Sequence, residues 1–173
     1  QSYANQEWVL NLDADERVPP ELEDELRALF SSAEKLKDIQ GFFLPRKTWY
    51  LNRWIKHGGW YPNYLLRLAR KNKARWTEPH LHENLWVEGI TEQLKNPLEH
   101  LSFPNQKSHI LKNIDYADQA AKMIFQKQGY FAGLFKLATK PCWKFIEIYF
   151  LKLGFLDGLA GFFIAVHSSY AQF

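Results

Sequence analysis

The feature that most restricts the fold of this chain is a short apolar run that ends in a group of carboxylates. The run is Glu7–Leu12, and Asp13-Ala14-Asp15-Glu16 follows it directly. An apolar run of this length is typical of a buried β-strand. In open α/β sheets, ligands bind beyond the carboxyl ends of such strands. We therefore expect an α/β domain in which this strand presents acidic residues to a ligand.

The sequence after these carboxylates predicts one helix and several strands. Pro19-Pro20 opens a segment whose apolar residues share one helical face, with acidic residues in its first turn. Further along, apolar and basic residues alternate between turn signals, which is the pattern of strands. The expected strands are Gly41–Tyr50, Tyr64–Ala69, Ala74–Trp76 and Leu85–Ile90.

The character of the sequence changes after Pro104. Apolar residues recur at helical spacing up to Gly129, and a second helical stretch is expected from Phe131 to Leu151. We therefore expect two parts, a mixed α/β sheet over residues 1–104 and a helical segment over residues 105–173.

Asp13 and Asp15 form the first candidate site. Two carboxylates one residue apart on a tight turn can hold Mg²⁺ or Mn²⁺ against a diphosphate. The alternative is structural, because Asp15 or Glu16 could cap the following helix. The tripeptide alone does not decide between the two.

His80-Leu81-His82-Glu83 is the second candidate site. Two imidazoles and a carboxylate can bind a metal or remove a proton. A metallohydrolase would need further ligands, and no HExxH helix is present. The structural alternatives are hydrogen-bonded imidazoles and a loop carboxylate paired with an arginine.

Charge is distributed unevenly along the chain, although its formal net value is only +3. Residues 7–38 hold ten acidic and four basic residues, whereas residues 40–80 hold nine basic and one acidic residue. Such asymmetry favours an anionic ligand beside a metal-binding pole. Arg67 is the strongest candidate for contacting phosphate, because it lies within an expected strand and should point opposite to Leu66 and Leu68. A solvated basic face is the alternative for most of the other basic residues.

The segment after residue 131 combines aromatic residues with lysines. It has no uncharged run of the ~20 residues needed to span a bilayer. Aromatic and basic residues on helices suit a position in the membrane interface, attracted to anionic lipid. The alternative is that these helices pack on their own domain or on a partner.

Two classes of protein are disfavoured by composition. The single cysteine, Cys142, rules out an internal disulfide framework and fits a reducing, cytosolic environment. Zinc-finger spacing and an RNP-like aromatic strand are both absent from the sequence, and the net charge is modest, so we do not expect nucleic acid as a partner.

Three segments together resemble one family. Trp8–Val18 resembles the DxD strand of family 2 glycosyltransferases with the GT-A fold, and His82-Glu83 resembles the acceptor-site loop of the lipopolysaccharide-core-type members. Lys152-Leu-Gly-Phe-Leu-Asp-Gly-Leu-Ala-Gly-Phe162 is similar to the tail of the same subgroup. The resemblance covers nearly the whole chain, in order, and implies the C-terminal portion of a GT-A domain.

The resemblance also implies a reaction and its residues. It implies inverting transfer of a hexose from a nucleotide-diphospho-sugar, UDP-linked, to a sugar of a lipid-linked glycan such as lipopolysaccharide core. Asp13, Asp15 and His100 would hold Mg²⁺ or Mn²⁺, Asp13, Asp15 and Arg67 would bind the donor diphosphate, and Glu83 would be the base with His82 beside it. The strands that recognise the nucleotide would precede Gln1, so we expect little activity from these residues alone.

The implied location is the bacterial cell envelope, with the protein in the cytoplasm and peripheral at the inner face of the cytoplasmic membrane. The rival function is a non-catalytic, membrane-associated or partner-binding domain derived from a transferase, which the same terminal helices would serve.

Overall fold

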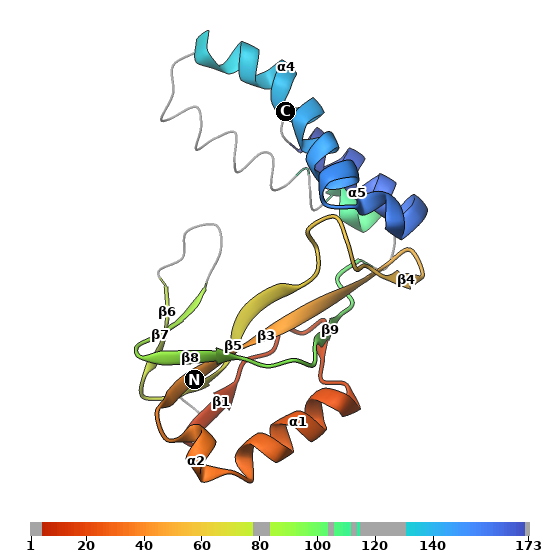
Figure 1. The fold of residues 1–173 in the computed structure, drawn as a ribbon. Coiled ribbons are helices and arrows are strands. Elements are labelled where there is room, and N and C mark those ends of the chain that lie inside the picture. The colour runs from red at the N-terminus through yellow and green to blue at the C-terminus, as the bar shows by residue number, and fades with distance from the viewer. Residues whose placement is uncertain (1–4, 78–83, 104–105, 112–113, 115–130, 172–173) are drawn as a thin grey trace. The chain divides into compact units, whose positions relative to one another are not determined.

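The computed structural model describes residues 5–77, 84–103, 106–111, 114 and 131–171 (Figure 1). The chain divides into two compact units, one formed by residues 1–47 and 62–100, the other by residues 48–61 and 101–173. They are called the sheet unit and the helical unit below, and each is described by itself. The helical unit therefore includes, besides the tail, a segment that lies between two strands of the sheet unit.

The sheet unit is built on a mixed β-sheet. Its strand order is β1-β5-β3-β9-β2, with β8 pairing beside β3. The pairings of β1 with β5, β5 with β3, and β2 with β9 are antiparallel, whereas β8 runs parallel to β3. The strands of this sheet are β1 (Trp8–Leu10), β2 (Glu16–Arg17), β3 (Ile39–Tyr50), β5 (Asn63–Arg70), β8 (Ile90–Gln93) and β9 (Leu98–His100).

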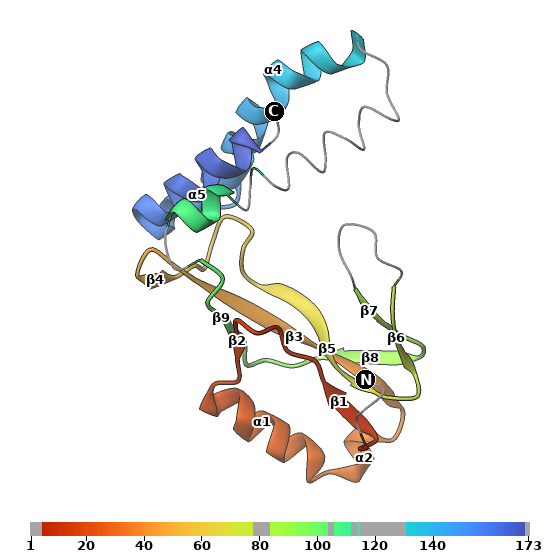
Figure 2. The same cartoon turned by 180° about the vertical axis from the view of Figure 1, so that it is seen from behind.

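Helix α1 (Pro20–Phe30) covers one face of this sheet (Figure 2). It begins with proline at its first position and carries Glu21 and Glu23 in its first turn, where the helix dipole favours negative charge. Its apolar stripe is buried in the main core, which contains Leu22, Leu29, Ile39, Phe42, Leu44, Leu68, Leu94 and Leu98. The short helix α2 (Ala33–Leu36) then leads into β3.

A separate hairpin and a β-bulge complete the sheet unit. The hairpin of β6 (Ala74–Trp76) and β7 (Leu85–Val87) packs Leu85 and Val87 with Leu66 and Ala69 in a second core cluster. In the β3–β5 pairing, Phe42 is opposite Leu68 and Phe43 is opposite Leu66, so Arg67 is the extra residue of a bulge. Leu66 and Leu68 therefore belong to different core clusters. The expectation that Arg67 points opposite to both was wrong, because the bulge breaks the strand alternation.

The helical unit starts with a tight turn after β3. Trp49 pairs with Trp54 and Tyr50 with Arg53, where β4 (Arg53–Trp54) returns. Leu51 and Asn52 both have positive φ, 47° and 60°, as a two-residue type I′ turn requires. The helices are residues 106–111, α4 (Phe131–Ile146) with a π-helical turn over Glu147–Leu151, a 3₁₀ turn over Gly154–Asp157, and α5 (Gly158–Tyr170).

Glycine permits the close packing of this helical end. A β-carbon on Gly161 would lie 1.8 Å from the carbonyl oxygen of Gly154, and one on Gly154 would lie 2.6 Å from the carbonyl oxygen of Ile148. Gly158 has φ of 59° and ψ of −137°, which side chains rarely allow. These glycines therefore have a structural role in the helical unit.

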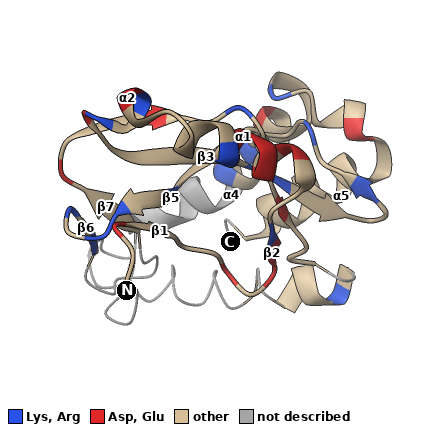
Figure 3. Cartoon of the chain, turned by 90° about the horizontal axis from the view of Figure 1, so that it is seen from below, with Lys and Arg blue, Asp and Glu red and all other residues tan. Residues whose placement is uncertain are grey.

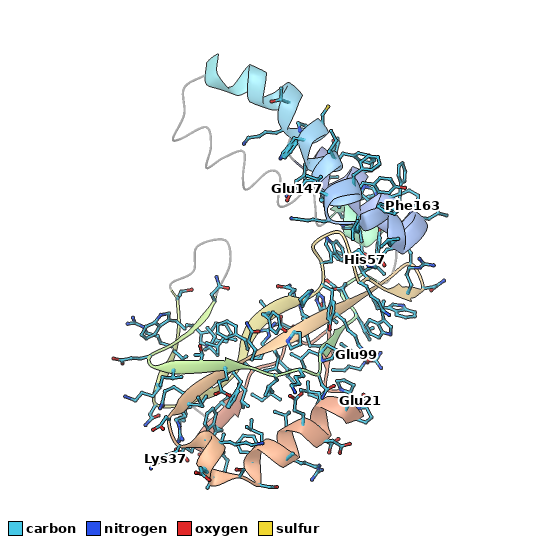
Figure 4. The ribbon with its side chains drawn as sticks, in the orientation of Figure 1. Glu21, Lys37, His57, Glu99, Glu147 and Phe163 are labelled. Atoms are coloured by element: carbon cyan, nitrogen blue, oxygen red, sulfur yellow. The ribbon has the colours of Figure 1, made fainter. Side chains whose placement is uncertain are left out.

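Asp157, which lies among these glycines, is buried and holds the loop after β4. One carboxylate oxygen accepts hydrogen bonds from the backbone N–H groups of Lys56 (3.1 Å) and His57 (2.7 Å), and the other lies 3.2 Å from Nδ1 of His57. Arg53 donates to the Asp157 carbonyl oxygen at 2.8 Å. Figure 4 labels His57 in this loop.

Most predicted elements are present, with different bounds. The prediction of one strand over Leu85–Ile90 was wrong, because Gly89 with φ of 119° separates β7 from β8. Strands β2, β4 and β9 were not predicted. Of the helix expected up to Gly129, residues 106–111 are helical, and residues 115–129 lie outside the described part of the chain.

Candidate functional site

The two aspartates lie on a turn that its own backbone closes. The N–H of Glu16 donates to the carbonyl oxygen of Asp13 at 3.0 Å, and the N–H of Asp13 donates to the carboxylate of Glu16 at 3.1 Å. The side chains of Asp13 and Asp15 remain about half exposed, at 52% and 41%. Figure 3 shows acidic residues along this turn between β1 and β2. The turn therefore presents two carboxylates to solvent from a fixed backbone.

Glu16 anchors this turn to two arginines. Its side chain is fully buried, and Oε1 accepts hydrogen bonds from Arg67 Nη2 at 2.7 Å and from Arg46 Nη1 at 3.2 Å. Arg67 also forms an ion pair with Asp13 through the same Nη2 atom, and Arg46 Nη1 lies 4.0 Å from Asp13. Two cationic and two anionic side chains therefore meet at this edge of the sheet.

The bulge explains how Arg67 reaches this cluster. Bulges aim a side chain away from the regular alternation of a strand. The carbonyl oxygen of Arg67 accepts a hydrogen bond of 2.7 Å from the N–H of Asn11, directly after β1. Within the described residues, Nε of Arg67 and Nε of Arg46 are buried without a hydrogen-bond acceptor. Both guanidinium groups thus have a buried N–H donor that makes no hydrogen bond within the described structure.

Asp15 lies beside His100. Its Oδ2 atom is 3.3 Å from Nε2 of His100, a buried residue at the end of β9. Pairing of β2 with β9 sets this contact, because it places Glu16 directly opposite His100. Beside them, Lys47 Nζ and Glu99 Oε1 form a 3.3 Å ion pair, with Glu99 labelled in Figure 4.

The helix-capping alternative does not hold in the structure. Helix α1 begins at Pro20, its N-cap residue is Pro19, and no side chain caps it. Asp15 contacts His100, and Glu16 contacts the two arginines. The acidic residues therefore belong to the charged cluster, not to the helix end.

The donor atoms fit a divalent cation in part. Neighbouring ligands of an octahedral ion at about 2.1 Å lie about 3 Å apart, close to the 3.3 Å between Asp15 Oδ2 and His100 Nε2. A carboxylate with an imidazole suits Mn²⁺ better than Mg²⁺, which prefers oxygen. Among the described residues, no group of three or more His, Cys, Asp or Glu side chains could hold a metal ion. A bound cation would therefore need ligands from the substrate or solvent.

The structure brings together four of the predicted site residues: Asp13, Asp15, Arg67 and His100. The predicted base Glu83 and its neighbour His82 lie outside the described residues. Sequence reasoning missed Glu16 as a member of the cluster and gave Arg46 no special place among the basic residues. The only signal for Glu16 was its position next to Asp15 in a run of acidic residues.

Comparison with known proteins points to glycosyltransferases. The chain is 27% identical over 178 residues to an uncharacterized glycosyltransferase of Rickettsia prowazekii (strain Madrid E). This alignment covers 96% of this chain and 60% of the relative. It is 25% identical over 175 residues to an uncharacterized glycosyltransferase of Rickettsia conorii (strain ATCC VR-613 / Malish 7). This alignment covers 96% of this chain and 62% of the relative. The Rickettsia typhi (strain ATCC VR-144 / Wilmington) relative, also named an uncharacterized glycosyltransferase, is 27% identical with the same coverage as the first.

The similarity has a defined extent. The chain spans about 60% of the length of the curated relatives it matches. No protein-family model matches the sequence. No solved structure matches it.

Proposed function

We propose that this chain is part of a glycosyltransferase that transfers a hexose, with inversion, from a nucleotide-diphospho-sugar to a sugar of a lipid-linked glycan. The observation that carries the proposal is the turn Asp13–Glu16, which presents two carboxylates beside Arg46, Arg67 and His100 at the edge of a mixed sheet. Similarity to proteins named glycosyltransferases over 96% of the chain supports the same class of reaction.

The finer assignments rest on the resemblance of the sequence to family 2 glycosyltransferases with the GT-A fold. It supports a UDP-linked donor and an acceptor such as lipopolysaccharide core. A lipid-linked acceptor implies that the protein works in the cell envelope, peripheral at the cytoplasmic face of the cytoplasmic membrane.

The charged cluster would bind the donor diphosphate. The donor carries negative charge that grows on the diphosphate as the bond to the anomeric carbon breaks, so cationic groups near it stabilise the transition state. Nε of Arg67 and Nε of Arg46 supply N–H donors without acceptors in the described structure. Glu16 holds both guanidinium groups in place, because it contacts each of them from a buried position.

Asp15 and His100, completed by ligands from the donor or solvent, would hold Mg²⁺ or Mn²⁺; Asp13, which the sequence also suggested as a ligand, is instead paired with Arg67. When bound, such a cation neutralises the charge of the leaving diphosphate. The contact between Asp15 and His100 keeps the two donor groups adjacent, and the pairing of β2 with β9 fixes their spacing. The ion pair between Asp13 and Arg67 links this part of the cluster to the arginines.

Glu83 would act as the base, with His82 beside it. An inverting displacement needs the acceptor hydroxyl to lose its proton as its oxygen attacks the anomeric carbon. In our proposal the proton passes to the carboxylate of Glu83, the new glycosidic bond forms, and the bond to the diphosphate breaks with its electron pair on the leaving oxygen.

The experiment is turnover of UDP-glucose by the complete protein, with sugar transfer to core glycolipid and donor hydrolysis measured separately. Glu83→Gln should reduce transfer by about 10²–10⁴-fold, the usual contribution of a positioned base. Glu92→Gln, an exposed carboxylate of β8, is the control and should keep wild-type activity. Full activity of Glu83→Gln would overturn the assignment of the base, and no turnover of nucleotide-sugars by the wild-type protein would favour the non-catalytic alternative.

A further inference from the structure

The helical unit exposes an unusual number of large apolar side chains. Leu159 is 75% exposed, Leu151 62% and Trp143 60%. Large exposed apolar surface on a protein usually marks an interaction site. Among the side chains that the structure describes in α4, α5 and the turns between them, the exposed large apolar ones are Trp143, Ile146, Phe150, Leu151, Leu153, Phe155, Leu156, Leu159, Phe162, Val166 and Tyr170.

These side chains recur at helical spacing in α5, which therefore has an exposed apolar face. In α5 the exposed positions are Leu159, Phe162, Val166 and Tyr170, separated by three or four residues. The opposite face of α5 is apolar as well, with Ala160, Ile164 and Ala165 buried in the core of the unit. No Asp, Glu, Lys or Arg occurs in α5. A surface helix in water normally carries a polar outer face, and this one does not.

The length and bend of the helix pair suit entry into a single leaflet. Within the described part of the chain, no single helix is both long and apolar enough to cross a bilayer. The stretches Thr139–Leu151 and Gly154–Tyr170 meet that test only together, and they are bent by 72° at the break between them. The 13 residues of α5 extend about 20 Å, less than the roughly 30 Å of a hydrocarbon core.

Several polar groups within the pair are satisfied inside the unit, although Nε2 of His167 is buried without a hydrogen-bond partner among the described residues. Glu147 forms ion pairs with Lys144 (3.0 Å) and Lys152 (2.5 Å), so its charge is compensated locally (labelled in Figure 4). The hydroxyl of Ser169 donates to the carbonyl oxygen of Ala165 at 2.6 Å. Asp157 is buried and accepts two backbone hydrogen bonds. Burying polar groups is costly unless they are paired, and these pairings lower the cost of leaving water.

The charge of the helical unit is complementary to an anionic bilayer. The side chains that the structure describes in this unit include six basic and two acidic ones. Lys140 is exposed on the helix pair itself, and a long lysine side chain can reach the headgroups while its helix lies deeper, whereas Lys144 and Lys152 pair with Glu147. Basic segments at a membrane surface gain about 1 kcal/mol per residue from anionic lipid.

We propose that this bent helix pair inserts its exposed apolar residues into one leaflet of an anionic bilayer, with its lysines at the headgroups. The partner is the lipid surface itself, not a protein. The inference does not depend on the transfer reaction, because none of these residues belongs to the charged cluster of the sheet unit.

Insertion depth can be measured in the complete protein with vesicles of phosphatidylglycerol and phosphatidylcholine. The exposed Cys142 is first removed by the substitution Cys142→Ser. A spin label is then attached to a cysteine introduced by Leu159→Cys or Phe150→Cys, or by Glu92→Cys as a control. We expect the first two labels to become accessible to oxygen at acyl-chain depth, while the control label stays in water. Labels that stay in water at all three positions would overturn the proposal.

A charge substitution tests the same surface by affinity. Leu159→Glu should weaken vesicle binding by about tenfold or more, since an acidic side chain within hydrocarbon costs several kcal/mol. Ile90→Glu is the matched control, because Ile90 is also a strongly exposed apolar residue, at 59%, but lies on β8 of the sheet unit. Equal binding of the two variants would contradict insertion. Concentration-dependent dimers that bury Leu159 without lipid would assign the surface to a second copy and also overturn the proposal.

The two proposals fail separately. Loss of vesicle binding in Leu159→Glu should leave hydrolysis of the soluble donor unchanged, whereas Glu83→Gln should leave vesicle binding unchanged.

Discussion

Glu16 and Arg67 form a buried ion pair, with 2.7 Å between Oε1 of the carboxylate and Nη2 of the guanidinium. The two residues lie 51 positions apart in the sequence, on β2 and β5, and the pair links the aspartate turn to the bulged strand. The candidate site therefore depends on a contact between β5 and the edge strand β2, which are separated by β3 and β9 in the order of the sheet.

Removing the buried carboxylate should destabilise the sheet unit. Glu16→Ala leaves Arg67 and Arg46 without their buried partner, and breaking such a pair costs about 3–5 kcal/mol. Glu23→Ala removes an exposed ion pair with Arg27 and should change the free energy of unfolding by less than about 1 kcal/mol. Chemical denaturation of both variants measures the difference, and equal stability would show that Glu16 has no structural role.

Asp157 should be as important to the stability of the helical unit as Glu16 is to that of the sheet unit. Asp157→Ala leaves the backbone N–H groups of Lys56 and His57 without their acceptor, and each unsatisfied group costs about 1–3 kcal/mol when buried. Asp157→Asn retains one oxygen acceptor and should be less damaging. The melting temperature should be highest for the wild type, lower for Asp157→Asn and lowest for Asp157→Ala. An unchanged melting temperature for Asp157→Ala would contradict the assigned contacts.

Gly161 should not tolerate a side chain. The β-carbon of Gly161→Ala would lie 1.8 Å from the carbonyl oxygen of Gly154, so the helix must move, at a cost of about 1–3 kcal/mol or more. Leu159→Ala, in the same helix but at an exposed position, is the control and should have a much smaller effect in water. Thermal unfolding compares the two, and a neutral Gly161→Ala would rule out the close packing.

Tyr50 should resist ionisation. Burial raises the pKa of its phenol to about 12, against about 10 for an ordinary tyrosine, and Nδ1 of His109 lies 2.9 Å from its oxygen. Because the folded-state pKa is the higher one, this stabilisation is complete below pH 10 and is lost as pH rises towards 12. NMR of ¹³C-labelled tyrosine should show the Tyr50 signal, assigned with Tyr50→Phe, titrating near 12; titration near 10 would contradict its burial.

The sequence predicted the local elements better than the contacts between them. Apolar spacing and Pro19-Pro20 correctly predicted α1, and the strand predicted at Ala74–Trp76 is present with the same bounds. Strands β2 and β9 have two and three residues, too few for a periodic signal. The bulge at Arg67 depends on the register between β3 and β5, which residue types along one strand do not determine.

The candidate site was predicted by residue type but not by arrangement. Asp13, Asp15 and His100 were named from the sequence, and the structure adds that Asp15 contacts His100 while Asp13 contacts Arg67. Glu16 could not be distinguished from its acidic neighbours, because its role depends on burial between two arginines from other strands. The expected roles of Glu83 and His82 remain predictions.

The most direct test of the central claim is the dependence of UDP-sugar turnover on Mn²⁺ in the complete protein, measured for the wild type, Asp15→Asn and His100→Ala. We expect the wild type to need the metal and both variants to need much higher Mn²⁺ or to lose turnover, while Glu92→Gln matches the wild type. Turnover that does not depend on metal, or wild-type metal dependence in both variants, would contradict the assignment of this site.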